Sequence, residues 1–375
     1  MKILVLNCGS SSIKYRLFDN QKSVFSGLIE KIGEKNSGIK NYESGLRLML
    51  KQLLKSKKIK AVSEIKAVGH RVVHGGNLSK PCITDKKVIK AIREFSEFAP
   101  LHNFANLKGI LTMHKILPKI PNIAVFDTAF HQSLPEKAFI YALPYEFYKK
   151  YRIRRYGFHG ISYQYISERA SKLLKKPLNK LNLIMCHLGA GCSMTAFSKG
   201  KVIDTSMGFT PLEGLVMGTR TGDIDAGILI YLSRKFKMTP DKLDDLLNKK
   251  SGLLGISGIS KDLREILKKH KKSKRCKIAL EIFCSRIKKY IAAYAALLGN
   301  VDAVIFTAGI GENSPMVRTL SADIPLLGMK IDEKKNKQGN EKEAIISSNS
   351  SKIRILVIPT NEEKMIAIEA EKLLK

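Results

Sequence analysis

The order of apolar and polar positions at the start of the chain predicts a strand, a tight turn and a second strand. Residues 3–6 form an unbroken apolar run, and a turn rich in glycine and serine follows at residues 7–12. Apolar side chains then alternate with polar ones at Ile13, Tyr15 and Leu17. A period of two residues is typical of a strand with one buried face, so this stretch is expected to continue as a strand.

The same arrangement returns in the second half of the chain. An apolar strand is predicted at residues 183–186, a small-residue turn at 187–193 and a strand at 194–197. Gly9 and Gly189 occupy the same place in the two copies. We infer that one supersecondary unit is used twice, once in each domain.

The remaining apolar periods alternate between those of strands and those of helices. Strands are predicted near residues 24–29, 67–73, 123–126, 201–206, 301–307 and 353–358, and helices near 42–57, 86–98, 276–298, after 314 and after 361. Gly299 is expected to end the long helix, and Ser314 and Asn361 to cap the starts of the last two. Residues 333–352 are polar and predict a mobile loop. Strands and helices that alternate in this way indicate an α/β protein.

The length of the chain indicates two domains, because 375 residues exceed what one hydrophobic core usually supports. No apolar run reaches the ~18–20 residues that span a bilayer. The run at residues 3–6 is too short for the core of a signal peptide. We therefore expect a cytoplasmic protein with no membrane partner.

The formal net charge of +33 by itself favours nucleic acid or another anionic surface as a partner. The lysines are spread along the chain in helix-face positions such as Lys55, Lys58 and Lys60, and no nucleic-acid recognition motif accompanies them. We expect no dedicated nucleic-acid partner, and a basic nucleic-acid-binding protein stays open as an alternative that rests on charge alone. Part of the charge suits a polyanionic substrate, and ATP is one.

The two small-residue turns have the features of phosphate-binding loops. A turn between strands directs successive backbone N–H groups at one anion, and small residues allow the anion to approach closely. In the first turn, the hydroxyls of Ser10 and Ser12 and the ammonium of Lys14 add donors. An ordinary hairpin turn is the alternative for either turn alone. A third glycine-rich turn is predicted at residues 309–313, between a predicted strand and a predicted helix, where α/β sheets bind nucleotides.

Four candidate catalytic residues stand in loops near the ends of predicted elements. Arg71 and Arg220 lie in glycine-flanked loops, whereas surface arginines usually lie on helix faces. His159 lies between two glycines, and Asp127 ends a buried strand, where an aspartate is often catalytic. A capping aspartate is the alternative for Asp127. Fixed guanidinium groups suit phosphoryl transfer, because the transferring group spreads negative charge over its oxygens.

Nine phrases of the sequence occur in the order found in acetate kinases, so the chain resembles that family over essentially its whole length. They read NCGSSSIKY, GHRVVHGG, APLHN, VFDTAFHQSLP, YGFHG, HLGAGCS, DTSMGFTPLEGLVMGTRTGDID, AGIGENS and PTNEE. The family is a branch of the superfamily of actin, heat-shock chaperones and sugar kinases. The resemblance implies an α/β fold of two similar actin-like ATPase (ribonuclease H-like) domains with ATP in the interdomain cleft. The domains are expected to comprise residues 1–131 plus 364–375, and residues 132–363.

The resemblance also implies an activity. Members of the family convert acetate and ATP reversibly to acetyl phosphate and ADP by direct in-line transfer, with Mg²⁺ (or Mn²⁺) as the metal, and are typically homodimers. The chain is therefore expected to be an ATP:acetate phosphotransferase. A kinase for propionate or another short-chain acid stays open, because one methylene is worth only ~1–3 kcal/mol. A non-catalytic ATP-binding module is a further alternative, against which the intact arginine pair argues.

Carried over residue by residue, the resemblance assigns roles to particular positions. The expected catalytic residues are Arg71, Asp127, His159 and Arg220; the expected acyl-pocket residues are Arg71, Val73, Leu101, Phe158 and Pro211; the expected metal ligands are Asn7 and Glu362. The expected ATP contacts are Ser10, Ser12, Lys14, His187, Leu188, Gly189, Ala190, Gly191, Asp262, Leu263, Arg264, Gly309, Ile310, Gly311, Glu312 and Asn313. A carboxylic acid substrate is already ionised at pH 7. We therefore expect Asp127 to orient an arginine or a magnesium-bound water rather than to act as a base.

The chain departs from the family's usual pattern at several positions. Ala190 stands where asparagine is usual, which removes one side-chain contact to phosphate but leaves the backbone N–H groups. Phe104, Ile161, Tyr163 and Ala226 also replace the usual residues. These changes bear on affinity and acyl preference, and they leave the expected catalytic residues intact.

Overall fold

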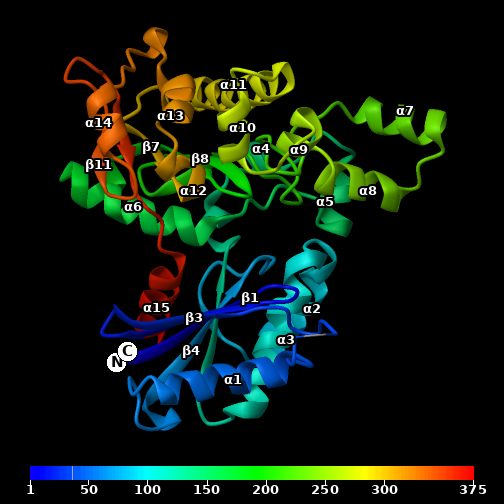
Figure 1. Ribbon diagram of the computed structural model, residues 1–375, viewed down its shortest axis with the longest axis vertical. Coiled ribbons are helices and arrows are strands. Elements are labelled where there is room, and N and C mark those ends of the chain that lie inside the picture. The colour runs from blue at the N-terminus through cyan, green and yellow to red at the C-terminus, as the bar shows by residue number, and fades with distance from the viewer. Residues whose placement is uncertain (36) are drawn as a thin grey trace. The chain divides into compact units, whose positions relative to one another are not determined.

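The computed structural model describes residues 1–35 and 37–375, apart from the side chains of Pro100 and Leu101. The described chain forms two compact units (Figure 1). Unit 1 comprises Met1–Gln132, Phe158–Tyr165 and Asn361–Lys375, and unit 2 comprises Ser133–Gly157 and Ile166–Thr360. Segment Phe158–Tyr165 thus packs with unit 1, whereas the domain boundaries expected from the sequence assign it to the second domain; those boundaries stay a prediction.

Unit 1 is built on a six-stranded sheet in the order β3-β2-β1-β4-β6-β5. Its strands are β1 (Lys2–Cys8), β2 (Ile13–Asp19), β3 (Lys22–Ile29), β4 (Ile65–Val72), β5 (Cys82–Ile83) and β6 (Asn122–Phe126). β1, β4 and β6 run parallel, and the outer strands are antiparallel to their neighbours. The carboxyl ends of β1, β4 and β6 therefore lie along one edge of the sheet.

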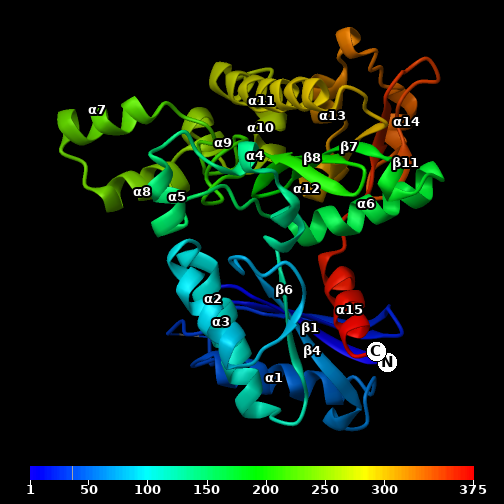
Figure 2. The ribbon, with the colours of Figure 1, turned by 180° about the vertical axis from the view of Figure 1, so that it is seen from behind.

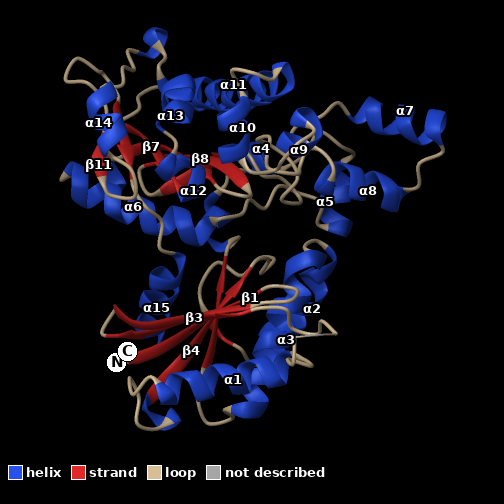
Figure 3. Ribbon diagram, in the orientation of Figure 1, coloured by secondary structure: helices blue, strands red, loops and turns tan. Residues whose placement is uncertain are grey.

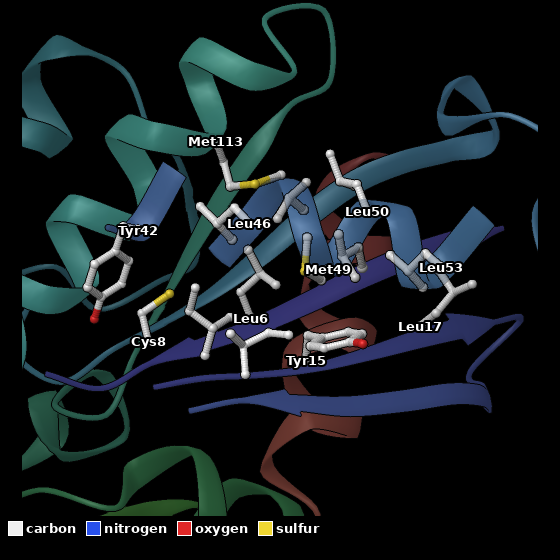
Figure 4. Close-up of a cluster of buried hydrophobic side chains, with 14 of the residues drawn as sticks. Leu6, Cys8, Tyr15, Leu17, Tyr42, Leu46, Met49, Leu50, Leu53 and Met113 are labelled. Atoms are coloured by element: carbon white, nitrogen blue, oxygen red, sulfur yellow. The ribbon is translucent and has the colours of Figure 1, made fainter. Parts of the chain in front are cut away.

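Helices cover both faces of this sheet, which is why β1 reads as an unbroken apolar run. On one face, Leu6 belongs to the same buried cluster as Met49 of α1 (Tyr42–Lys55), as Figure 4 shows. On the other face, Val5 is buried with residues of α15 (Glu362–Leu373), which lies beside β1 and β4 in Figure 2. The other helices of this unit are α2 (Lys86–Glu94) and α3 (Pro100–Ile116).

The sheet of unit 2 has the same topology as that of unit 1. Its order is β11-β12-β10-β7-β8-β9, so that β7, β10 and β12 take the places of β1, β4 and β6, again as parallel strands. The strands of both units are red in Figure 3. Its strands are β7 (Asn182–Leu188), β8 (Cys192–Ser198), β9 (Lys201–Thr205), β10 (Ala303–Thr307), β11 (Ala344–Ile345) and β12 (Arg354–Val357). The prediction of one supersecondary unit used twice, in an α/β fold of two similar domains, is confirmed.

Most predicted elements of the second half are present. Of the helices between residues 136 and 338, α11 (Lys274–Leu298) and α13 (Pro315–Ala322) were predicted from the sequence. The helices that were not predicted are α4 (Glu136–Phe139), α5 (Tyr145–Tyr151), α6 (Gly160–Leu174), α7 (Ala226–Phe236), α8 (Pro240–Lys249), α9 (Gly252–Ser257), α10 (Leu263–Lys269), α12 (Ala308–Asn313) and α14 (Glu333–Gln338). Gly299 ends α11, and the side chains of Ser314 and Asn361 cap α13 and α15, as predicted.

Two predictions about irregular segments are wrong. Residues 309–313, expected as a turn, belong to the short helix α12. The polar segment 333–352, expected as a loop, contains α14 and the edge strand β11. The Asp332 side chain accepts from the Lys335 N–H and caps α14. β11 is ordered by its pairing with β12, which a stretch with little apolar periodicity does not reveal.

Candidate active site

At the strand-end edge of unit 1, one arginine lies between two carboxylates. Arg71, expected from the sequence in a glycine-flanked loop, is instead the penultimate residue of β4. Asp127 follows β6 directly, and Glu362 is the first residue of α15. Asp127 Oδ2 accepts from Arg71 Nε at 3.1 Å and from Nη2 at 2.8 Å. Arg71 Nη1 lies 2.9 Å from Glu362 Oε2. The sheet edge thus brings together three predicted site residues that are far apart in the sequence.

Burial governs the electrostatics of this group. It raises the pKa of the Glu362 carboxyl to about 7, because desolvation outweighs the opposite effect of Arg71 and Asp127 adds repulsion. Burial also acts to lower the pKa of Arg71, but Asp127 and Glu362 outweigh it, so the net shift is upward. Arg71 is therefore a permanent cation, whereas Glu362 titrates near neutrality.

The titration of Glu362 predicts a pH-dependent contribution to stability. A carboxyl whose pKa is higher in the folded state stabilises the fold in its protonated form, and this contribution is lost as pH rises from about 4.5 to about 7. Between pH 4.5 and pH 8, the free energy of unfolding of the metal-free protein should therefore fall more than that of Glu362→Gln, by on the order of 3 kcal/mol. Urea denaturation of both proteins at the two pH values measures the difference; parallel pH profiles would contradict it.

Two buried carboxylate oxygens at this edge have no hydrogen-bond partner among the described residues: Asp127 Oδ1 and Glu362 Oε1. Carboxylate oxygens are ligands that Mg²⁺ prefers, and Mg²⁺ usually takes only one or two of them, with waters and substrate phosphates completing its shell. In the described part of the chain, no group of three or more His, Cys, Asp or Glu side chains is arranged as a metal cage. This donor set fits magnesium held together with a substrate.

The first glycine-serine turn follows β1. Gly9 N–H donates to the Ser12 carbonyl at 2.9 Å, and the Tyr42 hydroxyl donates to the Gly9 carbonyl. Asn7 and Lys14 face each other across the β1–β2 pair, and Lys14 Nζ lies 2.5 Å from Glu363 Oε1. Lys14, predicted as a phosphate contact, therefore has a carboxylate partner next to the predicted metal ligand Glu362. The Ser10 side chain is exposed.

The loop that carries His159 is bound to the segment after β6. Gly160 N–H donates to the Asp127 carbonyl at 2.9 Å, and His131 Nε2 lies 2.9 Å from the Phe158 carbonyl oxygen. His159 itself has a left-handed backbone conformation, with φ +59°. Strained backbone of this kind persists only where surrounding contacts hold it, and it is common at functional sites.

We expect Gly160→Ala to be destabilising by about 1–3 kcal/mol, because an added Cβ would lie 2.1 Å from the Asp127 carbonyl oxygen and 2.8 Å from Phe130 Cβ. Thermal denaturation measures the loss. Gly309→Ala is the matched control, because a Cβ there meets no heavy atom within 4 Å. Equal melting temperatures for the two variants would contradict the expectation.

The predicted acyl-pocket residues are divided between the two units. Val73 and Phe158 belong to unit 1, where Val73 N–H donates to Asn106 Oδ1 at 3.2 Å. The Phe158 and His74 rings meet edge to face, with their centroids 5.8 Å apart. Pro211 belongs to unit 2. The side chain of Leu101 lies outside the described residues.

Asn106 lies at the strand-end edge of unit 1 and was not among the residues predicted from the sequence. Its amide donates to the Cys8 carbonyl at 2.8 Å while its oxygen accepts from Val73 N–H, so it joins the carboxyl ends of β1 and β4. α3 carries two buried asparagines, Asn103 and Asn106, and their spacing of three residues, which places them on one helix face, was the available signal.

In unit 2, the second small-residue turn and α12 follow the adjacent parallel strands β7 and β10. Gly189 N–H donates to the Gly191 carbonyl at 3.0 Å, and the Ala190 side chain is exposed. Glu312 Oε1 accepts from Thr360 N–H at 3.0 Å. The predicted ATP contacts at residues 187–191 and 309–313 thus share one edge of the sheet.

Arg318 fixes the end of α12 and was also missed from the sequence. It is fully buried, and its Nη1 donates to the carbonyls of Gly311 at 2.9 Å and Glu312 at 2.8 Å. Its other N–H groups bond to Asn336 and Asn340, so all five donors are satisfied without a carboxylate. A single arginine in a polar helix pattern carries no local signal of this role.

The third group of predicted ATP contacts starts α10. Asp262 accepts from Arg264 N–H at 2.9 Å as the helix cap, and its Oδ2 also lies 2.6 Å from Arg264 Nη2. Leu263 is buried, whereas Arg264 is almost wholly exposed.

Arg220 differs from Arg71 in having no carboxylate partner among the described residues. Its Nη1 contacts the Pro211 carbonyl at 3.2 Å and Met217 sulfur at 3.7 Å. Burial lowers the pKa of Arg220, with a weak opposite effect from Cys192. A guanidinium that is desolvated and lacks a counter-ion is suited to bind an anionic ligand.

The two similar sheets, each with candidate ligand-binding loops after its parallel strands, define a two-domain α/β protein of the actin-like class. The family model described as the Acetokinase family matches residues 2–368, and the chain belongs to that family.

Several relatives resemble the chain over its full length. It is 49% identical to the acetate kinases of Thermoanaerobacter pseudethanolicus and Thermotoga maritima, with 100% of this chain and 99% of each relative covered. Among solved structures, the acetate kinase of Porphyromonas gingivalis matches with a TM-score of 0.94 at 42% identity, covering 100% of both chains. A propionate kinase from Francisella tularensis matches with a TM-score of 0.92 at 43% identity, covering 98% of both.

Proposed function

We propose that the protein is an acetate kinase that transfers a phosphoryl group reversibly between ATP and acetate. Full-length similarity to acetate kinases at 49% identity supports the proposal. The observation that carries it at the site is the contrast between two arginines: Arg71 lies between Asp127 and Glu362, and Arg220 is desolvated without a carboxylate partner. One guanidinium is fixed by the protein, and the other is available to an anionic reactant.

In the proposed reaction, the acetate carboxylate attacks the terminal phosphorus of ATP in line with the leaving ADP oxygen. Arg220 and Arg71 neutralise the negative charge on the transferring group and the acceptor carboxylate. Asp127 orients Arg71 by accepting from the arginine's Nε and Nη2 groups. It removes no proton, because acetate is already ionised at pH 7. His159 is proposed to donate to the transferring group.

Magnesium is proposed to be held at the strand-end edge of unit 1 by Glu362 and Asn7. When bound, it neutralises phosphate charge and shields the attacking carboxylate from repulsion. The free Oε1 of Glu362 suits this role, and Asp127 Oδ1 is a second acceptor for a metal-bound water. Residues 187–191, 262–264 and 309–313 are proposed to bind the nucleotide, together with Ser10, Ser12 and Lys14.

The test is hydroxamate trapping of acyl phosphate from purified protein with MgATP and acetate. Wild-type protein should give acetyl hydroxamate, and Arg220→Ala should give almost none. Absence of product with every acid, despite measurable ATP binding, would overturn the kinase and favour a non-catalytic ATP-binding module.

Propionate is the alternative acceptor, and this alternative is supported by 43% identity to a solved propionate kinase. Running the same assay with acetate, propionate and butyrate ranks the acids by kcat/KM. A higher kcat/KM for propionate than for acetate would reassign the acceptor while leaving the phosphotransferase intact.

A homodimer is proposed to form through α7. No residue of this helix, all of which is described, is buried, and its exposed side chains include Ile228, Ile230, Tyr231 and Phe236. An apolar helix face of this kind marks an interaction surface. Light scattering of Ile230→Lys should give a monomer mass where the wild-type protein gives a dimer; a monomeric wild type would reject the proposal.

Among the described residues, no helix has the length and apolarity needed to cross a membrane. We propose that the protein acts in the cytoplasm, where its nucleotide substrate is available. Fractionation of cells that express the protein tests this, and recovery in the membrane fraction would oppose it.

A further inference from the structure

Three side chains far apart in the sequence meet at the base of the loop that carries Arg220. Arg155 Nη2 donates to Glu213 Oε1 at 2.6 Å, and the Tyr141 hydroxyl donates to Glu213 Oε2. Burial, followed by the charge of Glu213, raises the pKa of Tyr141, so its hydroxyl keeps the proton it donates. Each oxygen of the carboxylate is thus bound by a different partner, and Glu213 joins the two.

These partners also hold the backbone at the start of the loop, residues 206–223, which we call the Arg220 loop. Arg155 Nη1 donates to the carbonyls of Thr205 at 3.1 Å and Ser206 at 3.3 Å. The Tyr141 oxygen accepts from Phe209 N–H at 2.9 Å. The side chains of Arg155 and Tyr141 therefore hold the first part of the loop in place.

The Arg220 loop packs closely at two glycines. A Cβ on Gly208 would lie 1.7 Å from Glu213 Oε2, and one on Gly214 would lie 2.6 Å from the Ser206 carbonyl oxygen. Gly214 also has φ +103°, a conformation that favours glycine. The network and the glycines together select one compact loop.

The far end of the Arg220 loop is held by a separate group. Asp223 Oδ1 accepts from Gly214 N–H at 2.7 Å, and its Oδ2 accepts from Tyr290 at 2.9 Å. Arg220 lies between the two anchored ends. Among the described residues, the hydrogen-bond partners of its guanidinium belong to the loop itself: the Pro211 carbonyl and the Met217 sulfur. The direction of its guanidinium therefore depends on where the loop places residue 211.

We propose that Glu213 is a positioning residue for Arg220. By joining Arg155 and Tyr141, it fixes residues 206–211 and so places the Pro211 carbonyl that orients the Arg220 guanidinium. The proposal rests on the proposed function only in that Arg220 acts on the transferring phosphoryl group. A misplacement of about 1 Å at such a group costs about 10²-fold in rate.

Two variants test the proposal without removing much volume. Tyr141→Phe deletes the oxygen that accepts from Phe209 and donates to Glu213, and Glu213→Gln keeps the side-chain shape but removes the charge that pairs with Arg155. Each should lower kcat for acetyl phosphate formation by about 10–100-fold while KM for ATP changes by less than about threefold. Tyr145→Phe is the matched control, because that side chain is largely exposed, and it should keep wild-type kcat.

A double-variant cycle separates positioning from a general structural role. In an Arg220→Lys background, which lacks the planar fork, Tyr141→Phe should lower kcat by less than about twofold further. A loss as large as in the wild-type background would overturn the proposal, because the effect would then not pass through Arg220.

Hydrogen exchange gives a readout that does not depend on activity. Amides of residues 206–222 should exchange faster in Tyr141→Phe and Glu213→Gln than in the wild type, with exchange in β7 and β10 unchanged. Unchanged exchange in the Arg220 loop would overturn the proposal. If the wild-type protein forms no acyl phosphate, the proposed function fails, whereas exchange still decides whether Glu213 orders this loop.

Discussion

Arg220→Ala is expected to lower kcat for acetyl phosphate formation by about 10³-fold with almost no loss of stability. The rate should fall because the guanidinium is the cation proposed to act on the transferring group, and removal of such a group typically costs 10²–10⁵-fold. Stability should hold within about 1 kcal/mol, because within the described part of the chain the side chain bonds only to one carbonyl and one sulfur. Steady-state kinetics and urea denaturation of the same preparation measure both quantities.

Two further variants control this prediction. Arg220→Lys keeps the charge but not the planar donors, so it should recover only a small part of the rate. Arg354→Ala removes an exposed arginine from the same unit and should change neither quantity. A normal kcat in Arg220→Ala would remove Arg220 from the catalytic group.

Arg71→Ala is expected to lose both activity and stability. Its guanidinium lies against Asp127, which is 1% exposed, and against the buried end of Glu362. Breaking a buried ion pair by removing one partner typically costs about 3–5 kcal/mol, because the remaining charge is left uncompensated. We expect the free energy of unfolding at pH 8 to fall by about that amount and kcat to fall by at least about 10³-fold.

The double variant Arg71→Ala, Asp127→Asn separates the two losses. Removal of the orphaned Asp127 charge should restore part of the stability, while activity stays lost. Arg47→Ala is the matched control. Arg47 is exposed, and its one ion pair with a described residue is with Glu43 one helical turn away, a contact worth about 0.3–0.5 kcal/mol. A fully stable Arg71→Ala would show that the two carboxylates are not held apart from water as the structure has them.

The fold could be predicted largely from short-range patterns. The apolar run of β1, the alternation of β2 and their repetition in β7 and β8 are local signals, and they led to the duplicated α/β unit. Helix caps such as Ser314 and Asn361 act within three residues, so they too are visible in the sequence. Segment 333–352 was misread because β11 is a strand only through its pairing with β12.

The sequence predicted which residues belong to the candidate site, but it did not predict the contacts between them. The glycine-flanked loops and the phrases shared with acetate kinases pointed to Arg71, Asp127, Arg220 and Glu362. They gave no indication that Arg71 lies between two carboxylates, or that Lys14 pairs with Glu363. Those contacts join residues at least 56 positions apart, which the folded sheet and the start of α15 bring together.

The sequence by itself determined most of the strands, several of the helices and the family to which the chain belongs, because periodicity, caps and ordered phrases are local properties of the chain. Only the tertiary structure decided which charges are paired. It left Arg220 without a carboxylate, surrounded Arg71 with two, and placed Glu213 between Arg155 and Tyr141. The physical reason is that desolvation and ion pairing depend on neighbours in space, which the order of residues along the chain does not specify.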